Sequence, residues 1–173
     1  MRYAAFLRAI NVGTHNRIKM VDLRQLCESA GLRDVTTYLQ TGNVLFDFDG
    51  DEPAAVAEID AALAGHGLRN AAASVRSARE LAELVAVNPF PPESEPKNRF
   101  VTLYQLPLPG GVADKAGKFA NVVAVRPREI FAERTPDGGP GDITANLGKL
   151  VPLQGTTRYW HVVEEVARML VPA

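Results

Sequence analysis

A proline-rich segment in the middle of the chain is the feature that most limits its fold. Of the 173 residues, four prolines fall between residues 88 and 98, at positions 89, 91, 92 and 96. Proline lacks a backbone N–H and clashes with the preceding helical turn, so neither a helix nor an interior strand can run through this density. We therefore predict an N-terminal subdomain over 1–88, a linker over 89–98 and a C-terminal subdomain over 99–173.

The N-terminal stretch carries hydrophobic patterns that change between the strand period and the helix period. Strand periodicity is found at 3–9, 35–40, 44–48 and 71–76. Gly42-Asn43 tolerates positive φ, which predicts a tight hairpin turn between the second and third strands. Helix signals are found at 20–30, at 51–65 and after the Ser77–Glu80 capping box. The first six elements follow the order of a ferredoxin-like unit.

The C-terminal stretch repeats this order of elements, although its residues show no matching period. Strands are expected at 100–106, 122–125, 129–134 and 156–160, and helices at 112–120, 143–150 and 162–170. A loop rich in glycine and proline is expected at 135–142. We predict an α+β fold of two ferredoxin-like (βαββαβ, alpha-beta plait) subdomains in tandem, each followed by an extra helix.

The charge of the chain is balanced overall but uneven along its length. The net charge is −1, which argues against general affinity for nucleic acid or anionic membranes. Residues 1–33 contain six Lys or Arg against two acids, whereas residues 34–66 contain seven acids and no Lys or Arg. The sequence therefore predicts a local basic patch in the N-terminal subdomain.

Several kinds of site and location are not expected. Cys27 is the single cysteine, so no internal disulfide forms, and its place on an apolar helix face predicts a buried, inert thiol. The histidines at 15, 66 and 161 lack ligand spacing, and neither a Walker loop nor a His-Glu-x-x-His motif occurs. We expect no metal, no cofactor and no membrane segment, and a cytoplasmic protein.

A set of polar side chains remains as the candidate ligand-binding surface. Its members are Arg8, Asn11, Asn16, Arg17, Gln40, Asn43, Arg158 and Trp160. If the second strand runs antiparallel to the first, the hairpin turn at 40–43 lies at the opposite end of the sheet from the loop after strand one. On that assumption the basic loop, with Arg8 and Arg17, is favoured over the turn.

Three groups of segments carry a resemblance to an uncharacterised bacterial family, the domain-of-unknown-function family 1697. They are Phe6–Gly13 with Asn16–Arg24, Thr37–Val44, and the later matches Val75-Arg76-Ser77-Ala78-x-Glu80-Leu81, Asn88-Pro89-Phe90 and Thr156-Thr157-Arg158-x-Trp160. The resemblance implies two ferredoxin-like subdomains and implies no activity. The chain departs from the family pattern at Gly141-Asp142, where relatives have Ser-Lys, and at the residues on either side of Trp160.

Three functions follow from these features. The first is a binding module for an anionic, phosphate-bearing ligand such as a nucleotide or nucleic acid, because of the basic N-terminal loop. The second is a small-molecule enzyme with its site between the two halves, with His161 as a proton carrier. The third is a structural or interaction protein in which Arg158 and Trp160 only pack. The oligomeric state does not follow from the sequence.

Overall fold

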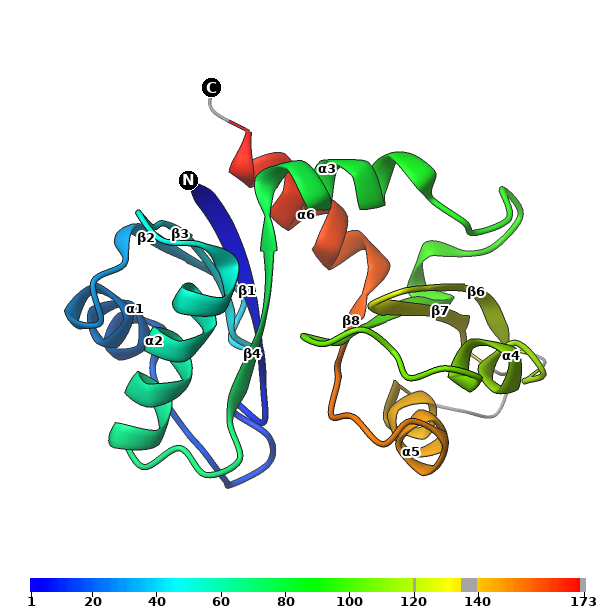
Figure 1. The fold of residues 1–173 in the computed structure, drawn as a ribbon, viewed down its shortest axis with the longest axis horizontal. Coiled ribbons are helices and arrows are strands. Elements are labelled where there is room, and N and C mark those ends of the chain that lie inside the picture. Colours follow the sequence, from blue (N-terminus) through cyan, green and yellow to red (C-terminus); the bar gives the residue numbers. More distant parts are fainter. Residues whose placement is uncertain (120, 135–139, 172–173) are drawn as a thin grey trace. The chain divides into compact units, whose positions relative to one another are not determined.

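The internal contacts of the chain divide it into two units. The computed structural model describes residues 1–119, 121–134 and 140–171. Unit 1 comprises Met1–Leu84 with Val166–Ala173, and unit 2 comprises Val85–Glu165. Figure 1 shows the helices and strands of both units.

Unit 1 is built on an antiparallel sheet with the strand order β2-β3-β1-β4. Its strands are β1 (Arg2–Arg8), β2 (Arg33–Tyr38), β3 (Asn43–Asp47) and β4 (Ala72–Ser77), and its helices are α1 (Met20–Ser29), α2 (Glu52–Gly65) and most of α3 (Ala78–Val87). Alternation along β1 places Tyr3, Ala5 and Leu7 on one face of the sheet. Helices α1 and α2 cover that face and form the core with it (Figure 1).

Side-chain caps are found at the N-termini of two of these helices, α2 and α3, where the sequence predicts that the helices begin. The Asp51 carboxylate accepts a hydrogen bond from the Ala54 backbone N–H at 2.9 Å and caps α2. The predicted capping box is confirmed before α3, because Ser77 Oγ accepts from the Glu80 N–H and the Glu80 carboxylate accepts from the Ser77 N–H. These contacts satisfy backbone donors that the helix itself leaves unpaired.

The Cys27 thiol is buried in the core of unit 1, as predicted, with 2% of its surface exposed. Burial raises the pKa of this thiol to about 12. We expect a disulfide-exchange reagent at pH 8 to label Cys27 in the folded protein roughly a thousandfold more slowly than in urea, because the thiolate is the reactive form. Rapid labelling in native buffer would contradict this burial.

Unit 2 repeats the arrangement with a second antiparallel sheet of order β6-β7-β5-β8. The strands are β5 (Arg99–Leu103), β6 (Val122–Arg126), β7 (Glu129–Glu133) and β8 (Thr156–Tyr159), and the helices are α4 (Val112–Ala116), α5 (Pro140–Leu150) and α6 (Trp160–Leu170), whose last residues belong to unit 1. Phe100, Tyr104, Ile130 and Leu147 form its core. The predicted mixed α+β class, with helices following each four-stranded sheet, is confirmed.

The proline-rich segment is anchored to unit 2 by one arginine. Apart from the short 3-10 turn η1 (Pro96–Asn98), residues 88–98 form neither helix nor strand. Arg99 donates hydrogen bonds to the carbonyls of Pro91 and Ser94, and its guanidinium lies 5.7 Å from the centre of the Phe90 ring. The contacts of Arg99 therefore fix this segment to unit 2, although the segment contains neither a β-strand nor an α-helix.

Some predicted boundaries differ from the structure. Strand β5 ends at Leu103, although the Tyr104 N–H still donates to the carbonyl of Arg128 in the register that pairs Leu103 with Glu129. Helix α4 ends at Ala116, before Gly117, which has low helix propensity. Trp160 begins α6 rather than ending the strand. The loop predicted at 135–142 falls mainly on residues 135–139, outside the described part of the chain.

No helix in the described ranges is long and apolar enough to cross a membrane.

Candidate functional site

The loop after β1 and the β2–β3 turn lie at the same end of the sheet of unit 1. Both β1 and β2 pair antiparallel with β3, so β1 and β2 run parallel and their last residues reach one edge. The Leu7 N–H donates to the Gly42 carbonyl at 2.8 Å, and Asn11 Nδ2 donates to the Gln40 carbonyl at 2.8 Å. The expectation that turn and loop lie at opposite ends is therefore wrong, because β2 has the direction of β1.

The side chain of Asn11 closes the base of this loop. Its Nδ2 donates to the carbonyls of Ile18 and Gln40, while its Oδ1 accepts from the Ile18 N–H at 2.8 Å. The backbone N–H of Asn11 also donates to the Asn16 carbonyl at 3.0 Å. These contacts fix the start and end of the loop against each other and against the hairpin turn.

Asn16 makes a second connection, from the loop to the chain before β4. Its Nδ2 donates to the carbonyls of Ala9 and Arg69, and its Oδ1 accepts from the Arg69 N–H at 3.1 Å. Because the polar atoms of Asn11 and Asn16 bind backbone groups, both residues act by positioning the loop.

Unusual backbone conformations gather at this end of unit 1. Five non-glycine residues here have positive φ: Ala9 (59°), Asn11 (52°), Asn16 (49°), Leu39 (59°) and Asn70 (58°). In the rest of the described chain only two others, Asp34 and Asn88, have it. Such conformations cost of order 1–3 kcal/mol each and concentrate at functional sites. The residues with positive φ therefore lie in the same region as the hydrogen bonds of Asn11 and Asn16.

A hollow of about 600 Å³ opens beside the loop that follows β1. This volume lies in the usual range of ligand pockets. Three of its lining residues are predicted site residues, Asn11, Arg17 and Gln40. The others are Ile18, Lys19, Met20, Asp22 and His66. The hollow lies within unit 1, between the loop, the start of α1 and the end of α2.

The hollow combines positive charge with the start of a helix. Arg17 donates to the Gly13 carbonyl at 3.0 Å, and within the described residues neither Arg17 nor Lys19 has a carboxylate at salt-bridge distance. Lys19 is the N-cap residue of α1 and makes no side-chain cap, and Met20 and Asp22 of the first turn also line the hollow, so the start of the helix borders it. Asp22, in the first turn, contributes the one carboxylate of the lining.

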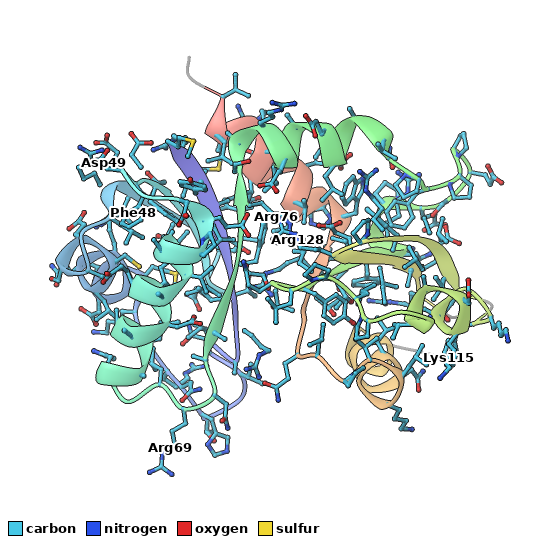
Figure 2. All side chains as sticks on the ribbon, viewed as in Figure 1. Phe48, Asp49, Arg69, Arg76, Lys115 and Arg128 are labelled. Atoms are coloured by element: carbon cyan, nitrogen blue, oxygen red, sulfur yellow. The ribbon has the colours of Figure 1, made fainter. Side chains whose placement is uncertain are left out.

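The end of the sheet that carries the hollow is basic, and the other end is acidic. Arg17, Lys19 and Arg69 lie at the first end, whereas Asp49 lies at the other, as the labels of Arg69 and Asp49 in Figure 2 show. At the acidic end the carboxylates have partners: Arg2 pairs with Asp47 at 3.3 Å, Arg33 pairs with Asp49, and Asp51 caps α2. The basic end therefore keeps its charge facing solvent.

Arg8 is placed apart from the hollow. It is half-buried at the end of β1 and does not belong to the lining. Burial lowers its pKa, and the nearby Asp60 carboxylate acts in the opposite direction. Burial likewise raises the pKa of Asp60, against a hydrogen bond from the Ala73 N–H and the charge of Arg8. Arg8 thus has an acidic neighbour of its own on α2.

Asn16, Asn43, Arg158 and Trp160, like Arg8, are not among the lining residues of the hollow. Asn43 is fully buried and donates to the Tyr38 carbonyl and Thr41 Oγ1, which holds the hairpin turn. Arg158 is buried in unit 2, where it donates to Thr156 Oγ1 at 2.7 Å, and burial lowers its pKa to about 10. Trp160 is 1% exposed and packs against aromatic rings of unit 2.

Sequence reasoning did not select His66 or Lys19. His66 follows α2 and is 47 residues from Lys19, so only the antiparallel direction of α1 and α2 brings them to one hollow. One signal was available, because α2 must end at the edge of the sheet where β1 ends in a βαββαβ arrangement. Among the described residues, no group of three or more His, Cys, Asp or Glu is placed to hold a metal ion.

Comparisons with known proteins agree with this fold. The family model described as a protein of unknown function, DUF1697, matches residues 1–131. A solved structure described as a conserved bacterial protein, SP0830 from Streptococcus pneumoniae, is similar with a TM-score of 0.68 and 19% sequence identity over 98% of each chain. At this identity the likeness concerns the fold alone. No curated protein matches.

Proposed function

Since the chain belongs to the DUF1697 family, whose description assigns no activity, we propose a function from its own geometry: unit 1 binds a phosphate-bearing anion in the hollow beside α1. The observation that carries the proposal is the convergence of Arg17 and Lys19 on an opening that also receives the start of α1. Helix N–H groups and basic side chains together form the usual surroundings of a bound phosphate. Nucleotides and nucleic acids are the ligand classes of this chemistry.

The charge distribution of unit 1 supports this assignment. A basic end, separated from an acidic end whose carboxylates already have partners, attracts an anion toward the hollow. The low net charge of the whole chain keeps this attraction local. The lining carries two cations, Arg17 and Lys19, against the single carboxylate of Asp22, so it remains net positive.

The rigidity of the loop supports it as well. Asn11 and Asn16 hold the loop to Ile18, Gln40 and Arg69 before any ligand arrives. A preorganised loop loses less conformational entropy on binding, so more of the interaction energy remains as affinity. The strained φ values near Ala9 and Leu39 are consistent with a conformation maintained for binding.

The double substitution Arg17→Ala and Lys19→Ala tests the function directly. We expect it to weaken pyrophosphate binding about a hundredfold, because each residue supplies a charge-assisted contact to the anion. Isothermal titration calorimetry at low ionic strength measures the affinity, which added salt reduces.

A matched control removes the same two charges elsewhere. Arg24→Ala with Lys97→Ala changes exposed residues that do not line the hollow, and it should leave pyrophosphate affinity unchanged. Absence of pyrophosphate binding by the unsubstituted protein at low salt would overturn the proposed function. Equal losses in the two double variants would assign the effect to net charge rather than to this hollow.

We also infer that each unit follows the ferredoxin-like plan. The central positions of β1 and β3 in one sheet and of β5 and β7 in the other, with every pair antiparallel, support this. In such a plan both helices cover one face, and the ends of β1, β2 and α2 share an edge with the start of α1. The candidate hollow lies at that edge of unit 1.

A further inference from the structure

A second hollow adjoins the first along the helix pair of unit 1. It measures about 390 Å³, and its walls are formed largely by small or apolar residues of α1 and α2 and the residue after α1: Leu26, Ala30, Ala61, Ala62 and Gly65. Ser29 and Glu58 add polar groups to it. His66 lines both hollows, so a ligand seated in the first has the second directly beside it.

Resting on the phosphate site proposed above, we propose that the ligand is a nucleoside monophosphate whose base carries an exocyclic amino group. The phosphate occupies the first hollow, near Arg17 and Lys19, and the base occupies the second, with its amino group toward Glu58. This assignment names the ligand class of the site and adds the base-binding half.

The two hollows have the spacing that such a ligand needs. Asp22 lines the first and Ser29 lines the second, and their separation of seven positions corresponds to about 10 Å along α1. This is the reach of one nucleoside monophosphate from its phosphate to its base. Asp22, at the start of that span, can accept hydrogen bonds from the ribose hydroxyls, which a carboxylate commonly binds.

The walls of the second hollow suit a planar, uncharged group. A Cβ added at Gly65 would meet no atom within 4 Å, so the space above this part of α2 is open to a flat ring. The lining contains neither Lys nor Arg, and Glu58 makes its far end negative. A second phosphate is therefore disfavoured there, and so is an acyl chain, whose end would reach a carboxylate.

The charge order of the two hollows determines which base is preferred. Positive groups at Arg17 and Lys19 and a negative group at Glu58 favour a ligand that is anionic at one end and a hydrogen-bond donor at the other. An exocyclic amino group is such a donor, whereas a base with a carbonyl at that position presents an acceptor to the carboxylate. Adenine and cytosine thus fit, and hypoxanthine and uracil do not.

Calorimetry with four matched probes tests the assignment: ribose 5-phosphate, adenosine 5′-monophosphate, inosine 5′-monophosphate and adenosine. We expect adenosine monophosphate to bind about tenfold more tightly than inosine monophosphate, the effect of one hydrogen bond to a charged group. It should also bind more tightly than ribose 5-phosphate, since only the nucleotide covers the second hollow. Glu58→Gln should reduce the preference for adenosine monophosphate over inosine monophosphate.

A substitution that fills the second hollow separates the two proposals. Gly65→Leu should abolish the advantage of adenosine monophosphate over ribose 5-phosphate while leaving pyrophosphate affinity unchanged. Ala64→Leu places a leucine at an exposed neighbouring position outside both hollows and should change neither affinity. Equal affinities of the unsubstituted protein for the nucleotides and ribose 5-phosphate would overturn the base assignment but not the phosphate site. Absence of pyrophosphate binding would overturn both.

Discussion

Replacing Trp160 by alanine is expected to lower the free energy of unfolding by about 3–5 kcal/mol, the usual cost of removing a large buried aromatic side chain. The ring is 1% exposed and contacts Phe131 edge-on, with centroids 5.4 Å apart, and Phe90 at 5.8 Å. Its removal leaves a cavity between these rings that the rigid strand and helix cannot close. Urea denaturation followed by far-ultraviolet circular dichroism measures the loss.

The substitution Trp160→Phe separates packing from hydrogen bonding. The indole Nε1 is buried and has no hydrogen-bond partner among the described residues, so a phenyl ring keeps most ring contacts and removes an unpaired donor. We expect Trp160→Phe to cost well under half as much as Trp160→Ala. Equal losses would mean that a phenyl ring does not restore the packing of the full indole ring, and that this close fit determines the contribution of Trp160.

Replacing Gly42 by alanine is expected to destabilise the protein by about 2–4 kcal/mol and to weaken pyrophosphate binding. Gly42 has φ of +85°, where an L side chain costs about 1–2 kcal/mol. The added Cβ would also stand 3.0 Å from Leu7 Cβ and 3.4 Å from Ile10 Cβ, both on buried side chains, and such overpacking costs about 1–3 kcal/mol. The turn must move, and Gln40 in the lining moves with it.

Gly67→Ala is the matched control for the turn. Gly67 has the same φ of +85°, but a Cβ there meets no atom within 4 Å. It therefore carries the backbone cost without the clash, and the difference between the two variants measures the fit of the turn against β1. If Gly42→Ala and Gly67→Ala destabilise equally, the close approach of the turn to Leu7 does not contribute.

Local features of the sequence were sufficient for the elements of the fold. The alternation in β1, the capping box at Ser77–Glu80 and the prolines at 89–96 act over a few residues, and the structure has a strand, a helix start and an irregular segment at these places. The single cysteine was correctly predicted as buried because its helix face is apolar. The boundaries at Leu103 and Ala116 differed from the prediction, and at the second of them Gly117, with its low helix propensity, follows α4.

The candidate site was only partly accessible to the same reasoning. The basic loop was recognised from its charge, and Arg17 and Asn11 do line the hollow. Gln40 was kept as a candidate but ranked below the loop residues, on an assumed strand direction that the sheet contradicts. Nothing local in the sequence distinguishes a lining residue such as Lys19 from Arg8, which is half-buried near Asp60.

The sequence by itself thus determined which segments become helices or strands and that the N-terminal third is basic, since periodicity, caps, prolines and charge are local properties of the chain. The tertiary structure alone decided which polar groups meet. The parallel direction of β1 and β2 brought Gln40 to Asn11, and the antiparallel direction of α1 and α2 brought His66 to the start of α1. Strand order and direction depend on how the whole sheet buries its apolar face, and no short stretch of sequence carries that information.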